Sequence, residues 1–298
     1  MSQESRPNCE GTKVHSLCGG TILSSDIALR GMINLEKEMA KKAAKDWERQ
    51  HEVTRYLNNA YAPLRNVLCD PEHLSEMEQG HRSHQDRFRS HKMHSPVRPK
   101  EQTRIFLGSL GARVPPPYDY EWTYRDPDPG DVGVGANGTT GELGFNIDSF
   151  GQDDYNSSGG TAVGIYFRPV TETGRLAIWS DPSFFESWYD YAYFSSSHSD
   201  GFIGLYVGSY DDNGQFTGAV VNQQQTLWND DSHLGSSGNH EDTNSGYSLS
   251  ANCWVDSGHQ YIIWVWAGGR AAADQVFGGA SAGSALTVTV PSITWELT

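Results

Sequence analysis

Lysine is absent from the last two thirds of the chain, where Lys100 is the final lysine of 298 residues. Residues 105–298 carry 5 arginines against 23 acidic residues, a balance of −18. Such a segment repels phosphate backbones, so we do not expect nucleic acid as a partner. Residues 1–104 hold the other 17 basic residues and 14 acids, a balance of +3 that gives no strong nucleic-acid signal.

Long hydrophobic runs are also missing. No stretch approaches the ~18 apolar residues of a transmembrane helix, so no membrane span is expected. The start, MSQESRPNCEGTKVHSLCGG, lacks the apolar core of a secretory signal peptide. We therefore expect synthesis in the cytoplasm and leave open export without a cleaved signal, or assembly into a particle.

Recognisable catalytic motifs are missing too. The chain has no Gly-x-Ser-x-Gly, no phosphate-binding loop, no His-Glu-x-x-His and no dinucleotide fingerprint. Glu186, Glu241 and Glu296 could belong to a carboxylate pair of the glycosidase kind, but the sequence gives no distance between them. No catalytic residue is therefore assigned, and an enzyme is less expected than a binding or structural module.

Cysteine and histidine give weak metal signals. The chain has only four cysteines, too few for a disulfide framework: Cys9, Cys18, Cys69 and Cys253. Residues 71–104 form a polar, histidine-rich segment that we interpret as a weak helix followed by a linker. Within it lie two i,i+3 histidine pairs, His81 with His84 and His91 with His94. Such pairs can hold zinc or nickel, but a solvated, pH-responsive linker is the favoured interpretation.

A helical pattern follows a flexible leader over residues 1–23. Ser24 supplies N-cap chemistry, and Pro63 ends or kinks the pattern. We predict an amphipathic helical segment over residues 24–70. The apolar stripe of this helix must pack against a partner. The β-domain, a second helix near residues 72–90, or other copies in a coiled-coil-like oligomer could provide it. The apolar residues that recur at helical spacing are Leu29, Met32, Ile33, Leu35, Met39, Ala43, Trp47, Val53, Tyr56, Leu57, Ala60 and Tyr61.

Residues 105–298 show alternating apolar and polar residues typical of strands. Turn signals separate about ten such runs, and no helical pattern intervenes. We predict a mainly β fold, with a C-terminal jelly-roll-like antiparallel β-sandwich after the N-terminal helical segment. Near the end the alternation changes phase around Pro291, which predicts a β-bulge there. The clearest run has Tyr247, Leu249, Ala251, Cys253 and Val255 in one phase.

Aromatic residues supply the candidate ligand site. Trp254 is out of phase with the apolar residues beside it and should point away from the core. Residues 184–194 hold a dense aromatic group that includes Trp188, Tyr189, Tyr191 and Tyr193. Exposed rings would form a stacking platform for sugars. The favoured alternative for this segment is a strand buried on both faces or at an interface.

Acidic loops supply the candidate metal site. Asp211 with Asp212, and Asp230 with Asp231, provide the oxygen ligands that calcium prefers, although no EF-hand pattern is present. The alternative, which we favour for any single loop, is that these side chains cap their own hairpin turns. No cofactor is otherwise expected.

These patterns predict a non-enzymatic binding or structural module. In this hypothesis the acidic β-sandwich recognises a neutral glycan, and the N-terminal helix provides self-association or docking. A structural subunit of a filament or particle, and a hydrolase acting on polysaccharide, are the alternatives, because sandwiches host all three.

Overall fold

A computed structural model describes residues 23–64, isolated positions between 70 and 88, and residues 111–126, 131–148, 155–169, 173–193, 195–233, 235–274 and 279–298. The predicted leader apart from Leu23, most of the predicted linker and both histidine pairs lie outside these residues. Leu23 is buried against the sheet and so is not part of a flexible leader.

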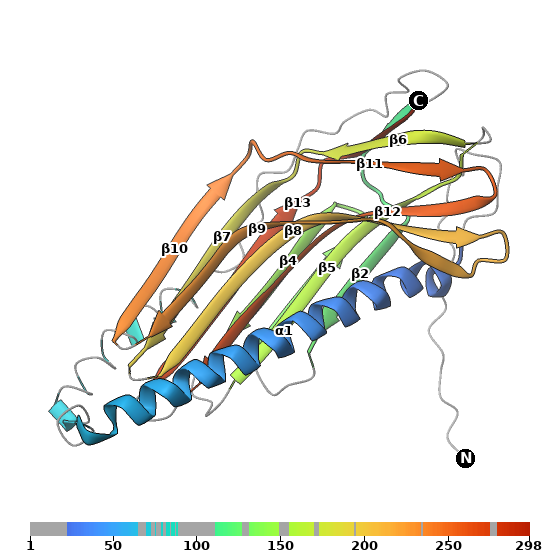
Figure 1. The fold of residues 1–298 in the computed structure, drawn as a ribbon. Helices are drawn as coiled ribbons and strands as arrows, with labels where there is room; N and C mark the ends of the chain where they lie inside the picture. The colour runs from blue at the N-terminus through green and yellow to red at the C-terminus, as the bar shows by residue number, and fades with distance from the viewer. Residues whose placement is uncertain are drawn as a thin grey trace, which may run out of the picture.

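Antiparallel strands dominate the fold and form three sheets, which confirms the mainly β prediction (Figure 1). One sheet has the order β2 (Tyr120–Arg125), β5 (Tyr155–Phe167), β12 (His259–Asp274), β8 (Ser196–Asp211), β9 (Phe216–His233). A second has the order β10 (Ser236–Asn244), β7 (Ser183–Ala192), β13 (Ala280–Thr289), β4 (Glu142–Asp148), β3 (Asp131–Asn137). The third has the order β1 (Gly111–Val114), β14 (Ile293–Leu297), β6 (Thr173–Ser180), β11 (Leu249–Asp256).

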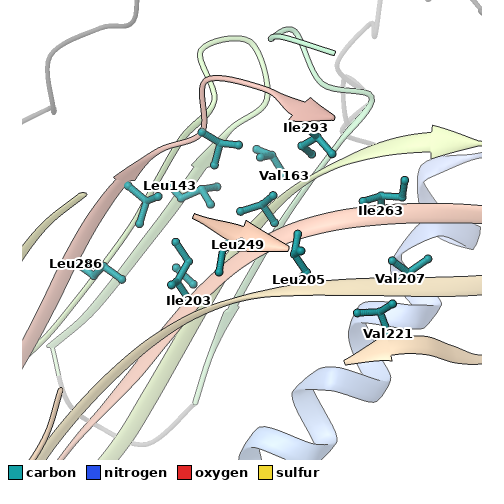
Figure 2. Packing of buried hydrophobic residues seen from close by; sticks show 14 of the residues in the cluster. Leu143, Val163, Ile203, Leu205, Val207, Val221, Leu249, Ile263, Leu286 and Ile293 are labelled. Atoms are coloured by element: carbon teal, nitrogen blue, oxygen red, sulfur yellow. The ribbon is translucent and has the colours of Figure 1, made fainter. Parts of the chain in front are cut away.

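The core of the sandwich lies between the first sheet and the other two. Figure 2 shows aliphatic side chains from all three sheets meeting there, among them Leu205 of β8, Leu286 of β13 and Leu249 of β11. Each of these side chains is 0% or 1% exposed. Burial of this kind is the main source of stability in a sandwich of two layers.

Helix α1 (Ser25–Tyr61), followed by the short helix η1 (Ala62–Leu64), lies along the outer face of the β2–β9 sheet (Figure 1). Met32, Leu35 and Met39 belong with Trp264 and Trp266 of β12 to a second apolar cluster. The amphipathic helix is therefore confirmed, and its own β-domain covers its apolar stripe. No helix among the described residues is long and apolar enough to cross a membrane.

The change of phase near Pro291 marks a change of sheet. β13 ends at Thr289 in one sheet, and β14 begins at Ile293 in another. Val290 and Ile293 are both buried, so both apolar sets reach the core as expected. The predicted β-bulge is wrong, because the chain crosses between sheets at this point and does not continue along one strand.

Candidate functional site

Trp254 is the most exposed tryptophan that the structure describes, with 70% of its surface accessible. It lies on β11, an edge strand, between the buried residues Cys253 and Val255. Because side chains alternate across a strand, burial of these neighbours in the sandwich directs the indole to solvent. An indole can bury roughly 150–250 Å², and one that is exposed at the surface can use this area in contact with a ligand or a partner.

A second tryptophan lies on the same face of this sheet. Cross-strand partners share a face, and the register pairs Trp254 with Arg175 and Ser250 with Trp179. Trp179 is half-buried, whereas Ser250, Asn252 and Arg175 are exposed. Figure 1 shows β6 and β11 on the side of the molecule opposite α1. We call the solvent side of these two strands the tryptophan face, defined by Arg175, Ala177, Trp179, Ser250, Asn252 and Trp254.

The two indoles lie far enough apart to contact different parts of an extended ligand. Trp179 is four positions along β6 from Arg175, the partner of Trp254. At about 3.4 Å per residue and about 4.8 Å between strands, the Cα atoms of the two tryptophans are roughly 14 Å apart. Ser250 and Asn252 occupy β11 between them and offer hydrogen-bond donors and acceptors. The arrangement suits a chain of rings lying along the strands.

The strand register places two carboxylates at this face, and they are well separated. The register of the strands places Glu296 of β14 beside Ala177 and Asp256 of β11 beside Thr173. Strand geometry separates the Cα atoms of these two acids by roughly 17 Å. Asp256 also accepts a hydrogen bond from the Gly258 amide at 3.0 Å and lies 2.8 Å from His259 Nδ1.

The structure does not bring the three candidate glutamates together. Glu241 is opposite Ser187 in the β7–β10 register, so it lies on the other face of that sheet from Glu186. Glu296 belongs to a different sheet. Burial raises the pKa of Glu186, and His240, 3.6 Å away, lowers it in part. Glu186 is a buried carboxyl that has neither of the other two glutamates as a partner.

The tyrosines of β7 and the residue after it do not form an exposed platform. Tyr189, Tyr191 and Tyr193 are 2%, 8% and 4% exposed, which contradicts the platform and matches the alternative of a buried strand. Tyr189 packs edge-on against Phe88 and donates a 2.7 Å hydrogen bond to Asp148. Phe88 lies outside the strands, so the cover over this face could not be inferred from the tyrosines alone.

Trp188 differs from these tyrosines. It is half-buried, points to the opposite face of β7 from Tyr189, and packs against the main core. Its ring centroid lies 6.1 Å from that of His240. Trp188 lies on a different sheet from Trp254 and does not join the tryptophan face.

The four candidate calcium ligands are at opposite ends of one hairpin. Asp211 and Asp212 lie at the β8–β9 turn, whereas Asp230 and Asp231 are paired with β8 residues near the far end. Asp211 accepts hydrogen bonds from the amides of Asn213 (2.9 Å) and Gln215 (2.8 Å), as a turn-capping residue does. Across the described residues, no three side chains of the His, Cys, Asp and Glu types form a metal-binding group. The two aspartate pairs therefore do not converge on one site.

Sequence reasoning identified Trp254 but missed Trp179. The available signal was the same in both cases, because Trp179 is out of phase with the buried Ile178 as Trp254 is with Cys253. The sequence did not reveal that Trp179 lies opposite Ser250 on a partner strand. β6 and β11 are distant in the chain, so their pairing could not be inferred from local alternation.

Comparison with protein-family models finds no match, and comparison with curated proteins finds none. Among solved structures, one neighbour is described as a promiscuous carbohydrate-binding module of the β-sandwich superfamily. It has 9% identity and a TM-score of 0.19, with 59% of this chain and 56% of that chain covered. This chain therefore spans little more than half the length of that neighbour.

Two further neighbours are carbohydrate-binding modules. TmCBM61, in complex with β-1,4-galactotriose, has 11% identity and a TM-score of 0.17, with 61% of this chain and 90% of that chain covered. A family 11 module from Clostridium thermocellum, in complex with a mixed-linked tetrasaccharide, has 10% identity and a TM-score of 0.18, with coverages of 61% and 97%.

Proposed function

We propose that this chain is a non-enzymatic binding module that holds a neutral glycan on the tryptophan face. The observation that carries the proposal is the 70% exposed indole of Trp254 on a strand whose other face is buried. The apolar faces of sugar rings stack on indoles, and the hydroxyl groups at their edges need donors and acceptors. Ser250 and Asn252 supply these beside the indole.

The charge of the chain supports a neutral ligand over an anionic one. The formal net charge is −15, so a phosphorylated or sulfated glycan meets a repulsive field over most of the surface. Near the tryptophan face the strand register places one arginine, Arg175, and two acids, Glu296 and Asp256. This local excess of acid also disfavours an anionic ligand.

Binding without hydrolysis is part of this proposal, and the wide spacing of the two acids at the tryptophan face supports it. We expect the ligand to be released unchanged.

A glycan array on the full-length protein tests this proposal. We expect neutral oligosaccharides to be retained, and Trp254→Ala to abolish retention without changing the melting temperature. Trp295→Phe is a matched control, because Trp295 packs against Phe167 on the inner side of the same sheet. Retention of the same glycans by Trp254→Ala would place the site elsewhere. Release of reducing sugar from a bound polysaccharide would favour the hydrolase.

The helix supports a second candidate, self-association or docking. Ile33, Val53 and Tyr56 of α1 are 45%, 38% and 73% exposed. Val53 and Tyr56 are three residues apart and adjoin on the helix surface, whereas Ile33 lies about 30 Å away along the helix axis. We keep this as a proposal for assembly, including assembly into a particle, that is compatible with glycan binding.

A further inference from the structure

The chain contains two Asn-Gly dipeptides, Asn137-Gly138 and Asn213-Gly214, and both lie in hairpin turns. Asn137 is the last residue of β3 and leads into the turn to β4, whereas Asn213 lies in the turn between β8 and β9. Both asparagines are exposed. An Asn-Gly pair can cyclise, because the glycine nitrogen can reach the side-chain carbonyl carbon and no side chain hinders its approach. The two turns hold the reacting atoms in different surroundings.

A carboxylate from β2 holds the amide of Gly138. The Gly138 N–H donates to Glu121 Oε2 at 2.9 Å. A carboxylate at this distance is in position to accept the amide proton as a general base. In the other turn, the Gly214 N–H donates to the main-chain oxygen of Asp211 at 2.9 Å. A neutral carbonyl is a much weaker base than a carboxylate, so of the two glycine nitrogens that of Gly138 is the better prepared to react.

Main-chain amides polarise the side-chain carbonyl of Asn137. Its Oδ1 accepts hydrogen bonds from Thr139 N at 3.0 Å and from Thr140 N at 3.2 Å. Attack on Cγ would turn this oxygen into an oxyanion, and two preorganised N–H groups stabilise that charge as it forms. Such bonds are also the ordinary capping bonds of an asparagine turn. The carboxylate on the Gly138 amide is therefore the feature that sets this site apart from a simple capped turn.

The fold does not require glycine at position 138. Gly141 and Gly214 have φ values of 76° and 75°, whereas Gly138 is not in this left-handed region. A Cβ at Gly138 would lie 3.5 Å from Tyr118 O and 3.6 Å from Glu121 Oε2, which is ordinary van der Waals contact. The turn can therefore accept alanine at this position, and Gly138→Ala can be used to test the chemistry without loss of the fold.

We propose that Asn137 deamidates through a cyclic imide formed with Gly138, and that Glu121 is the general base. Glu121 takes the Gly138 amide proton, the nitrogen forms a bond to Asn137 Cγ, and Nδ2 leaves as ammonia with the proton that Glu121 returns. One water molecule then opens the imide at either carbonyl and leaves aspartate or isoaspartate at position 137. The new carboxylate lies beside Glu142, the cross-strand partner of Asn137. This self-modification does not depend on glycan binding.

Incubation of the full-length protein near neutral pH, with digestion and mass spectrometry at intervals, tests the proposal. In the folded chain we expect Asn137 to deamidate faster than Asn213, with isoaspartate among its products. In guanidinium chloride, which unfolds both turns, the two Asn-Gly sites should deamidate at similar rates. A folded chain in which Asn137 reacts no faster than Asn213 would overturn the proposal. Aspartate without any isoaspartate would also overturn it, because opening of an imide gives both.

Glu121→Gln keeps an acceptor for the Gly138 amide but removes the base, so it separates catalysis from support of the turn. We expect it to slow deamidation of Asn137 at least about tenfold, with the rate at Asn213 and the melting temperature unchanged. Gly138→Ala should also slow the reaction, because its methyl group crowds the nitrogen. Glu142→Gln is the matched control and should not slow it, since Glu142 bonds to a threonine hydroxyl of the same turn. An unchanged rate in Glu121→Gln, or an equal loss in Glu142→Gln, would overturn the proposal.

Discussion

Gly31 of α1 lies directly against the hydroxyl group of Tyr210 of β8. The Gly31 amide donates to this oxygen at 3.2 Å, and the hydroxyl donates to Ala28 O at 2.6 Å. A Cβ at Gly31 would come within 2.7 Å of the same oxygen. The contact fixes the first turns of the helix on the sheet, and it explains a glycine within a helix.

A double-mutant cycle tests this contact. Alanine is favoured over glycine inside a helix by about 1 kcal/mol, but in the wild type the Tyr210 hydroxyl opposes it. We expect Gly31→Ala to be neutral or destabilising alone, and to stabilise the Tyr210→Phe background by about 1 kcal/mol. Urea unfolding measures the difference. An equal effect in both backgrounds would show that the hydroxyl does not restrict this position.

Substitutions at two positions of α1 distinguish a role in packing on the sheet from a role in self-association. Met39 is 8% exposed and lies in the apolar cluster with the sheet, whereas Ile33 is 45% exposed. Met39→Asp buries a charge and should destabilise the fold by several kcal/mol. Ile33→Asp should change stability by less than about 0.5 kcal/mol.

Light scattering on the same two variants tests self-association. If α1 associates through its exposed apolar residues, Ile33→Asp lowers the particle mass while the melting temperature holds. A wild-type chain that is monomeric at all concentrations would remove the assembly proposal.

Local alternation predicted strands that are buried on one face. In β11, the alternation correctly placed Leu249 and Cys253 inside and Trp254 outside. It gave less information for β12, where Trp264 and Val265 are adjacent and both 0% exposed. Helix α1 covers one face of that strand and the core of the sandwich covers the other, so the strand does not alternate between apolar and polar residues. The pattern therefore predicted strand type well and left the layer order undetermined.

Non-local pairing explains what the sequence left open at the sites. The tryptophan face needs the β6–β11 register, and the apolar cluster under α1 needs the helix placed over the β2–β9 sheet. Those contacts join residues far apart in the chain, such as Gln50 and Arg270. The exposure of Trp254 was predictable because it depends on one strand, whereas the burial of Tyr189 depends on Phe88 from a distant segment.

Asp190 should make stability fall as the pH rises. It is 1% exposed and accepts hydrogen bonds from Ser232 and from the Gly238 amide. Burial and the neighbouring Asp230 raise its pKa from 3.8 to about 8. The folded state therefore holds the Asp190 proton more tightly than the unfolded state does. The stability that this proton contributes is complete below about pH 4 and is lost as the pH rises through about 8.

Asp190→Asn mimics the protonated form. We expect it to flatten the dependence of unfolding free energy on pH between about 4 and 8, and to be more stable than wild type above about pH 8. Burial disfavours a charged His198, but hydrogen bonds to Asp200 and Asp231 raise its pKa to about 9. Deprotonation of His198 therefore also lowers the free energy of unfolding as the pH rises toward 9, in the wild type and in Asp190→Asn alike. If the unfolding free energy of Asp190→Asn fell with pH as steeply as that of the wild type, Asp190 would not be the source of the pH dependence.

Calcium should not change stability through the four candidate aspartates, because the two pairs lie at opposite ends of the β8–β9 hairpin. Thermal melting in chelator and then in excess calcium measures this. A melting temperature that falls with chelator and recovers with calcium would require a site that these residues do not form, since a ligand of the folded state stabilises it by mass action.

The affinity of one array-identified neutral oligosaccharide for wild type and for Trp254→Ala, measured by calorimetry, tests the central claim most directly. If the tryptophan face is the site, the substitution lowers affinity at least about tenfold, or roughly 1.4 kcal/mol, and Trp179→Ala lowers it as well. Trp295→Phe should bind as wild type does. Equal affinity in wild type and Trp254→Ala would contradict the account.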